Sequence, residues 1–280
     1  MSGADVGPAE LADAPLGHAT GYPDAYAPAL LYPIARAPQR QALGIGDALP
    51  FDGADVWTAY DLTWLDPRGR PHVGIATLEV PAASPRIVES KSMKLYLGSF
   101  AQTRFDAAGD VTAAVTHDLT AATGAPVRVV LDRPAQVAGM VLRELDGIDL
   151  DTLDVACTAY DVDATLLAAG DGQVAETLRT DLFRSMCPVT GQPDLGSLRI
   201  AYEGAPLDRP ALVRYLVSYR CHPGFHEHCV ERIFMDVKRH CAPTKLTVEA
   251  RFTRRGGLDI NPFRTDAGAS VPANVRTARQ

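Results

Sequence analysis

The first regular pattern along the chain is an alternation of apolar and polar residues on both sides of a turn. Residues 55–65 and 72–81 are two such runs, and the turn DPRGRP joins them. A period of two on both sides of a Gly/Pro turn predicts a β-hairpin. The face of the first strand that we expect to be buried consists of Val56, Tyr60, Leu62 and Trp64.

Two helix-like stretches follow this hairpin, and the second half of the chain repeats the order. In the first half these helices span residues 89–102 and 110–124, and a short extended run follows at 126–133. The second half has extended runs at 176–186 and 196–204, helices at 209–220 and 225–240, and extended runs at 245–253 and 258–264. Val230, Ile233 and Val237 form one apolar stripe at helical spacing, which supports the last helix.

Equivalent elements of the two halves are separated by nearly equal distances along the chain. The first strands start at residues 55 and 176, and the strands after the helix pairs start at 126 and 245, so the offsets are 121 and 119. Residue identity between the halves is negligible, so only the pattern repeats. It predicts an α+β protein of two tandem β-β-α-α-β(-β) units, each an antiparallel sheet with both helices on one face.

This pattern predicts three parts and an oligomer. We expect an N-terminal arm at residues 1–50 without a periodic pattern, a first unit at 51–160 and a second unit at 161–280. Sheets with open edges tend to be paired or covered, so a homodimer or higher homo-oligomer is expected.

Length and composition are those of a globular protein with a substantial core: 280 residues, 46% hydrophobic and 22% charged. The net charge of −7 argues against nucleic acid as a partner, because binding a phosphate backbone requires a basic face. No apolar run approaches the ~20 residues that cross a bilayer, and the N-terminus does not have a signal-peptide pattern. We therefore expect a cytoplasmic protein with a small-molecule partner, no membrane contact, and five reduced cysteines.

One cysteine and one aspartate flank a short loop in the second half. Cys187 ends an extended run, and Asp194 follows a Gly-Gln-Pro turn. A free cysteine is most often a buried core residue. The functional alternative is a thiolate nucleophile with an acid across the loop, because the atom that gains charge during attack needs a proton. The spacing alone leaves both interpretations open.

The segment CHPGFHEHCVE is rich in residues that can bind zinc. Cys221, His226 and Cys229 could approach one another around a metal, whereas His226 and His228 point about 200° apart on a helix. The alternative makes His226 a half-buried residue at the start of the apolar stripe. Glu227 then lies in the first helical turn, where the helix dipole favours a carboxylate.

Hydroxyl and basic residues gather in the segment ESKSMKLY, which begins at Glu89. As a helix N-terminus this segment could bind phosphate, but it also fits an ordinary solvated helix start. No G-x-G-x-x-G motif follows a strand, so a dinucleotide would bind without a Rossmann turn. Arg254 and Arg255, in a predicted hairpin turn, are further candidates for phosphate contacts, although turn arginines are often only solvent-exposed.

Four motifs, in this order, resemble those of a known enzyme family: ESKSMKLYL, CPVTGQPD, FHE and RRGGLDINPFR. With GYPDAYAPALLYPIARAPQR and GADVWTAYDLTWL, the resemblance covers most of the chain. The family is the long, two-module form of NADPH-dependent 7-cyano-7-deazaguanine reductase, the nitrile reductase of queuosine biosynthesis, which has the tunnelling fold (T-fold). Two positions depart from the family pattern, since Leu195 stands where a Trp is expected and Gly191 where an Asn is expected.

The resemblance implies a reaction and roles for named residues. The nitrile of 7-cyano-7-deazaguanine would be reduced to an aminomethyl group by two hydrides from NADPH. The Cys187 thiolate would form a covalent thioimide, with Asp194 as general acid and His226 assisting proton transfer. The implied substrate residues are Val88, Glu89, Ser90, His226 and Glu227, because a carboxylate can accept two adjacent N–H groups. The implied cofactor residues are Ser90, Lys91, Arg255 and Gly256, and no metal is implied.

Two further expectations concern the arrangement of the site and the rival functions. Motif residues fall in both predicted units, so we expect one active site per chain, and a fragment of residues 165–280 should be inactive. The first rival is a zinc-dependent pterin or GTP-ring hydrolase using Cys221, His226 and Cys229, which stoichiometric zinc would favour. The second is a non-catalytic purine-binding module, whose nucleotide binding would survive Cys187→Ala without any wild-type turnover.

Overall fold

The structure is a computed structural model of the chain, and it describes residues 21, 23–137, 139, 141–268 and 272–280. The chain divides into two compact units. Unit 1 comprises residues 1–44, 54–141 and 254–260, and unit 2 comprises residues 45–53, 142–253 and 261–280. Much of the expected N-terminal arm, residues 1–20 and 22, lies outside the described residues. The division of the chain at residues 50 and 160 stays a prediction.

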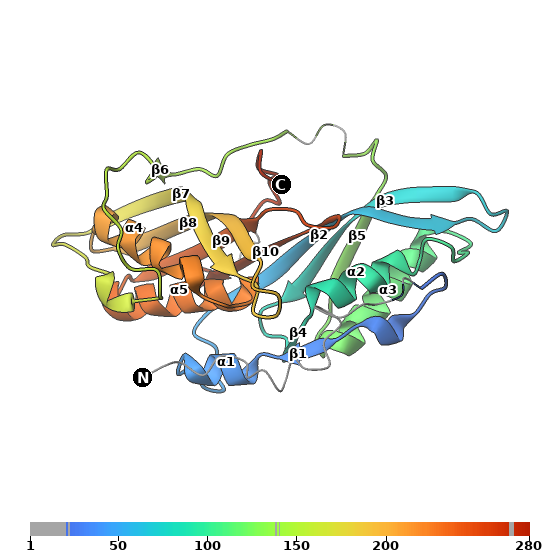
Figure 1. Ribbon diagram of the computed structural model, residues 1–280, viewed down its shortest axis with the longest axis horizontal. Coiled ribbons are helices and arrows are strands. Elements are labelled where there is room, and N and C mark those ends of the chain that lie inside the picture. Colours follow the sequence, from blue (N-terminus) through green and yellow to red (C-terminus); the bar gives the residue numbers. More distant parts are fainter. Residues whose placement is uncertain (1–20, 22, 138, 140, 269–271) are drawn as a thin grey trace. The chain divides into compact units, whose positions relative to one another are not determined.

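Unit 1 is a small antiparallel sheet covered on one face by two helices (Figure 1). The strands are β2 (Asp52–Leu65), β3 (Pro71–Pro81) and β5 (Arg128–Asp132), in the order β5-β3-β2, and the start of β10 (Leu258–Thr265) lies beside β2. The helices are α2 (Ser90–Gly98) and α3 (Ala108–Thr123), and their apolar sides pack into one core with the sheet. These elements match the predicted ones closely.

The described part of the expected arm has regular structure that its composition did not indicate. It contains a 3₁₀ turn η1 (Pro28–Leu30), a strand β1 (Pro33–Ala35) paired with β4 (Arg86–Val88), and a short helix α1 (Ala37–Ala42). The missing periodic pattern in this segment therefore does not mean that helix and strand are absent from it. Arg36, fully buried between β1 and α1, forms an ion pair with Asp55, and this tertiary contact anchors the segment.

The buried face of β2 also differs from the prediction. Trp57, Ala59, Leu62 and Trp64 lie in the core, whereas Tyr60 is only half-buried. A β-bulge between Ala59 and Leu62 adds a residue to β2 and reverses the alternation at that point. Strict alternation cannot reveal a bulge. Val56, Leu62 and Trp64 are buried as predicted, and Tyr60 is not.

Unit 2 has the same design with a larger sheet (Figure 1). The strands are β6 (Ile148–Asp149), β7 (Val174–Met186), β8 (Pro193–Gly204), β9 (Lys245–Phe252) and β10, in the order β10-β9-β8-β7-β6. The helices on one face are α4 (Arg209–Val217) and α5 (His226–Cys241), and the 3₁₀ turns are η2 (Ala164–Leu166) and η3 (Ser218–Cys221). β6 runs parallel to β7, so the sheet is not wholly antiparallel as expected.

The repeat predicted from the pattern extends to bulges and buried hydrogen bonds. β7 has a bulge between Thr180 and Phe183, as β2 has between Ala59 and Leu62. In each unit a tyrosine of the first helix donates to an aspartate of the second, Tyr96 to Asp118 at 2.7 Å and Tyr215 to Asp236 at 2.8 Å. The two units thus share one packing scheme. No helix within the described parts of the chain is long and apolar enough to cross a membrane.

Candidate active site

Cys187 lies in the loop that joins β7 to β8 in unit 2. Its N–H donates to the Gln192 carbonyl at 2.8 Å, and its own carbonyl accepts from the Gly191 N–H at 3.0 Å. Gly191 has φ +66°, a left-handed conformation that Gly and Asn adopt more readily than other residues. A glycine in place of the expected asparagine therefore suits the loop. The Cys187 side chain is half-buried.

Asp194 and His226 meet beside this loop. Asp194 lies on β8 opposite Ser185 of β7 and is only 6% exposed. The Met186 N–H donates to the His222 carbonyl at 2.8 Å, which ties the end of β7 to the segment before α5. His226, at the start of α5, then has its Nε2 3.7 Å from Asp194 Oδ1. The structure therefore brings the predicted catalytic residues of unit 2 to one end of the β7–β8 hairpin.

Glu227 and Cys229 extend this cluster into the buried side of α5. Glu227, in the first turn, is 2% exposed. Burial is the main cause that raises the pKa of the Cys229 thiol to about 12, and the negative charges of Asp194 and Glu227 contribute to this rise. Charge effects fall with distance, so both carboxylates lie near Cys229. Cys229 therefore stays protonated, and the half-buried Cys187 is the thiol available to a ligand.

The potential zinc ligands of the segment 221–229 occupy different environments. Cys221 is exposed in η3, whereas Cys229 is fully buried in α5. Within the ranges that the structure describes, no group of three or more His, Cys, Asp or Glu side chains is arranged to hold a metal ion. The zinc hydrolase alternative therefore has no ligand cluster among these residues.

His222 predicts an acid-dependent loss of stability. Burial lowers its pKa from the ordinary 6.5 to about 4, so the folded protein keeps it neutral while the unfolded chain takes up a proton below pH 6.5. The free energy of unfolding should fall by up to about 3 kcal/mol as the pH drops from 6.5 to 4. In urea unfolding, we expect His222→Gln to lose less free energy of unfolding than wild type between pH 6.5 and 4. The control variant, His117→Gln at an exposed histidine, should lose as much as wild type. Equal acid sensitivity of His222→Gln and wild type would contradict the assignment.

Glu89 in unit 1 caps α2. Its carboxylate accepts the N–H groups of Lys91 at 2.7 Å and Ser92 at 2.8 Å, and the side chain is fully buried. Two amide groups of the first turn are thus already bonded to a carboxylate. The interpretation of these amides as a phosphate seat was wrong, because a charged cap occupies them. Val88 precedes Glu89 at the end of β4, and its side chain lies in the core.

The RRGG turn lies next to α2 within unit 1. Arg255 and Leu258 exchange backbone hydrogen bonds, and Gly256 and Gly257 have φ of +55° and +79°, as a two-residue type I′ turn requires. A Cβ on Gly256 would lie 3.2 Å from Cδ of Lys94, so that lysine packs over the turn. A cavity of about 170 Å³ lies between them. The structure thereby joins two of the predicted cofactor motifs.

Arg254 and Phe252 differ from what their positions in the sequence indicated. Arg254 lies over the Tyr60 ring, 4.8 Å from its centroid, which is a cation–π contact rather than an open phosphate contact. Phe252, expected only as a core residue, lies edge-on against His226 with ring centroids 3.9 Å apart. Its contact depends on β9 lying under α5, a non-local arrangement that no local pattern signals.

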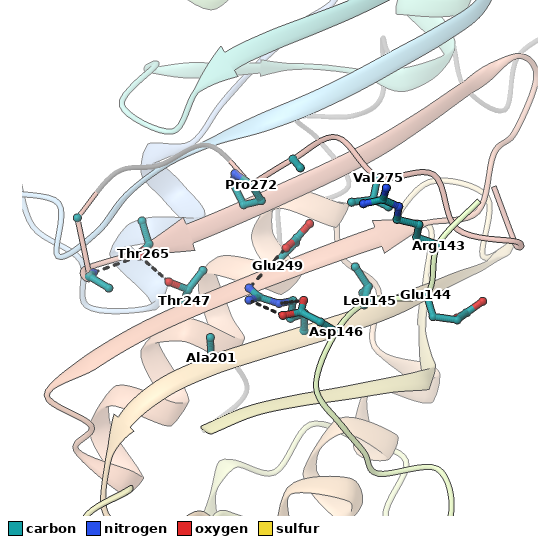
Figure 2. Close-up of a pocket in the computed structure, with 14 residues that line it drawn as sticks. Arg143, Glu144, Leu145, Asp146, Ala201, Thr247, Glu249, Thr265, Pro272 and Val275 are labelled. Atoms are coloured by element: carbon teal, nitrogen blue, oxygen red, sulfur yellow. Dashed lines mark hydrogen bonds and ion pairs between the residues drawn. The ribbon is translucent and has the colours of Figure 1, made fainter. Parts of the chain in front are cut away.

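A separate cavity of about 520 Å³ lies on the sheet of unit 2 (Figure 2). Its charged and hydroxyl groups bond one another, with Arg199 donating to Asp146 at 2.6 Å and Thr247 paired with Thr265 at 2.7 Å. Its lining residues do not include Cys187 or Asp194. This cavity is therefore distinct from the candidate catalytic cluster.

Comparisons with known proteins identify the family of the chain. Residues 22–131 match a family model described as "Nitrile reductase, 7-cyano-7-deazaguanine-reductase N-term", and residues 193–270 match one described as "QueF-like protein". Relatives in Burkholderia pseudomallei (strain 1106a), Burkholderia mallei (strain SAVP1) and Burkholderia thailandensis are named NADPH-dependent 7-cyano-7-deazaguanine reductase. Each is 56% identical over 268 residues, which is 95% of this chain and 98% of the relative.

One solved structure is a weak match. The archaeosine synthase QueF-Like in the apo form covers 36% of this chain and 99% of its own, with 19% identity and a TM-score of 0.31. A score this low does not bear on the fold. Asp194, His226 and Glu227 lie inside the second matched stretch, and Cys187 lies between the two stretches.

Proposed function

The chain belongs to the NADPH-dependent 7-cyano-7-deazaguanine reductases, and we propose that it reduces the nitrile through a covalent thioimide on Cys187. It is an oxidoreductase that acts on a nitrile with NADPH, and 7-aminomethyl-7-deazaguanine, a queuosine precursor, is the product. The observation that carries the mechanism is that one hairpin holds both Cys187 and Asp194, with His226 3.7 Å from the aspartate.

Addition of the thiolate requires a proton at the nitrile nitrogen. The Cys187 sulfur bonds to the nitrile carbon, and one π pair of the C≡N bond moves to nitrogen. Asp194 takes up the proton that the Cys187 thiol loses and donates it to this nitrogen, which gives the neutral C=N–H of a thioimide. His226 lies close enough to Asp194 to return a proton to it, and Phe252 contacts the imidazole edge-on.

Glu227 is the carboxylate that we assign to the ring N–H groups of the substrate. It is buried beside Asp194 and Cys229 in the first turn of α5, where the helix dipole stabilises its charge. The two oxygens of Glu89 each accept a backbone N–H already, so its main role is to fix α2. Val88 and Ser90 remain predicted substrate residues, and only the backbone of Val88 is available for this, because its side chain is in the core.

Glu227→Gln should weaken substrate binding more than turnover. An amide offers one acceptor and one N–H₂ group where the ring needs two acceptors, so we expect KM for the nitrile to rise about ten- to a hundredfold with a smaller change in kcat. Steady-state rates at saturating NADPH measure both constants. The exposed Glu144→Gln is the matched control and should behave as wild type. An unchanged KM in Glu227→Gln would remove Glu227 from the binding role.

The cofactor residues proposed are Ser90, Lys91, Arg255 and Gly256. Support comes from Lys94, which packs beside the turn that carries Arg255 and Gly256 and lines a cavity there together with Asp61. NADPH, when bound, supplies the two hydrides that the four-electron reduction requires. Side chains rather than the capped amides of α2 would hold its phosphates.

We also propose the T-fold for both units, a homodimer or higher homo-oligomer, and a cytoplasmic location. The β-β-α-α-β order in each unit supports the fold assignment. Half-buried and exposed free thiols such as Cys187 and Cys221 suit a reducing compartment.

Absorbance of NADPH tests the proposed reaction. Purified protein should oxidise two NADPH per molecule of 7-cyano-7-deazaguanine and none without it. No oxidation by the folded, reduced wild type would overturn the proposal. Stoichiometric zinc retained after chelator treatment, together with hydrolysis of a pterin or GTP ring, would then favour the hydrolase alternative.

A further inference from the structure

Unit 1 contains a hairpin that corresponds position by position to the hairpin that carries Cys187. The register pairs Trp64 with His72 in unit 1 and Ser185 with Asp194 in unit 2. In both hairpins the same number of residues separates the bulge of the first strand from the loop. His72 therefore occupies the position of Asp194.

The loop of unit 2, residues 187–192, is one residue longer than the loop of unit 1, residues 66–70, and both close with equivalent backbone hydrogen bonds. Asp66 donates its N–H to the Arg70 carbonyl at 2.9 Å, as Cys187 donates to Gln192 at 2.8 Å. The Asp66 carbonyl accepts the Gly69 N–H at 2.9 Å, as that of Cys187 accepts from Gly191 at 3.0 Å. Asp66 thus stands in the position of the proposed nucleophile, so unit 1 has no thiol there to attack a nitrile.

A cavity of about 710 Å³ lies at this end of unit 1, and its volume is within the range of small-molecule sites. Its floor is aromatic, because the rings of Trp64 and His72 stack with centroids 5.6 Å apart and an interplanar angle of 17°. The His72 side chain is 42% exposed, so a surface of the imidazole remains open to a ligand. This end of unit 1 therefore has a cavity but no thiol at the position that corresponds to Cys187.

The ionisable groups of this cavity favour a positive charge. Three carboxylates, Asp66, Asp106 and Asp132, line it together with the guanidinium of Arg133 and the imidazole of His72, whose Nε2 lies 3.6 Å from Asp66 Oδ2. The backbone N–H of Arg70 holds the pKa of Asp66 below its usual value, so this carboxylate is ionised at neutral pH. An aromatic floor with surrounding carboxylates is suited to a flat ring that carries a cationic group.

We propose that this cavity is a second, non-catalytic binding site for a planar nitrogen heterocycle that bears a positive charge. The ring stacks on His72, and the charged substituent lies among the carboxylates. The deazaguanine product with its protonated aminomethyl group is such a molecule, whereas the nitrile has the same ring without the charge. The inference rests on the proposed function only for this choice of probe.

Binding stoichiometry of the full-length protein tests the site. In equilibrium dialysis, wild type should bind two molecules of 7-aminomethyl-7-deazaguanine per chain, one at the proposed active site and one in this cavity. Asp106→Asn combined with Asp132→Asn should weaken the second site about tenfold or more and leave NADPH oxidation unchanged. The exposed Asp24→Asn, also in unit 1, is the matched control and should bind two. The nitrile should bind the second site about tenfold more weakly than the product.

Tryptophan emission gives an independent readout. The two tryptophans of the chain, Trp57 and Trp64, both lie in unit 1, and Trp64 lines the cavity. Product should quench the emission of wild type and of Asp24→Asn at the concentrations that fill the second site, and the double variant should require more product. One bound product per chain in wild type, or two bound with equal affinity in the double variant, would overturn the inference. If the protein binds product at the second site but does not reduce the nitrile, the result contradicts the proposed function and supports the second site.

Discussion

Replacing Cys187 with alanine should abolish nitrile-dependent oxidation of NADPH, with a fall of about 10⁴-fold or more. The proposed route needs a sulfur that bonds to the nitrile carbon, and alanine has no atom that can do so. The loop should survive the change, because its closure depends on backbone bonds from residue 187 to Gln192 and Gly191. Initial rates of NADPH oxidation, with circular dichroism to confirm folding, measure the effect.

Cys221→Ala is the matched control for this prediction. Cys221 is an exposed free thiol of the same unit, so its removal tests whether thiol loss in general affects the rate. We expect wild-type activity in this variant. A Cys187→Ala protein that kept even one hundredth of the wild-type rate would show that hydride transfer does not require the covalent intermediate.

Asp194→Asn should lower kcat by about 10²- to 10⁴-fold, the range expected for loss of a general acid. The amide has nearly the same shape as the carboxyl group, but it cannot donate the proton that the nitrile nitrogen needs. Asp194 is 6% exposed, so water has little access to replace it as the acid. The binding of the nitrile, measured as KM, should change much less than kcat.

The control for Asp194 is Asp171→Asn, an exposed aspartate of unit 2, which should leave kcat unchanged. Rapid mixing of Asp194→Asn with the nitrile should also reveal slow formation of the covalent species. Wild-type turnover by Asp194→Asn would mean that another group, such as His226, delivers the proton directly.

Alternation and helical spacing predicted the elements of the fold well. β9 and β10 begin where the pattern places them, and the inward face of β9 is Leu246, Val248, Ala250 and Phe252, all fully or almost fully buried. The prediction failed at two places where the structure depends on more than the local sequence pattern. A bulge reversed the core face of β2, and a buried ion pair ordered the segment around Arg36.

The candidate site could be predicted as a set of residues but not as a cluster. Cys187, Asp194 and His226 acquire their roles from motif resemblance, whereas their proximity depends on the β7–β8 register and on the bond from Met186 to His222. These contacts are non-local, so they cannot be predicted from composition or periodicity. Glu89 could not be assigned one role from the sequence, because a carboxylate just before a helix can either cap the helix or bind a ligand.

The covalent intermediate is the central claim, and intact-protein mass spectrometry tests it most directly. Wild-type protein incubated with 7-cyano-7-deazaguanine and no NADPH should gain the full mass of one nitrile, because addition of the thiol expels no leaving group. Peptide mapping should place the added mass on Cys187, and adding NADPH should remove it. An unmodified mass under saturating nitrile, in protein that turns over when NADPH is added, would contradict the thioimide.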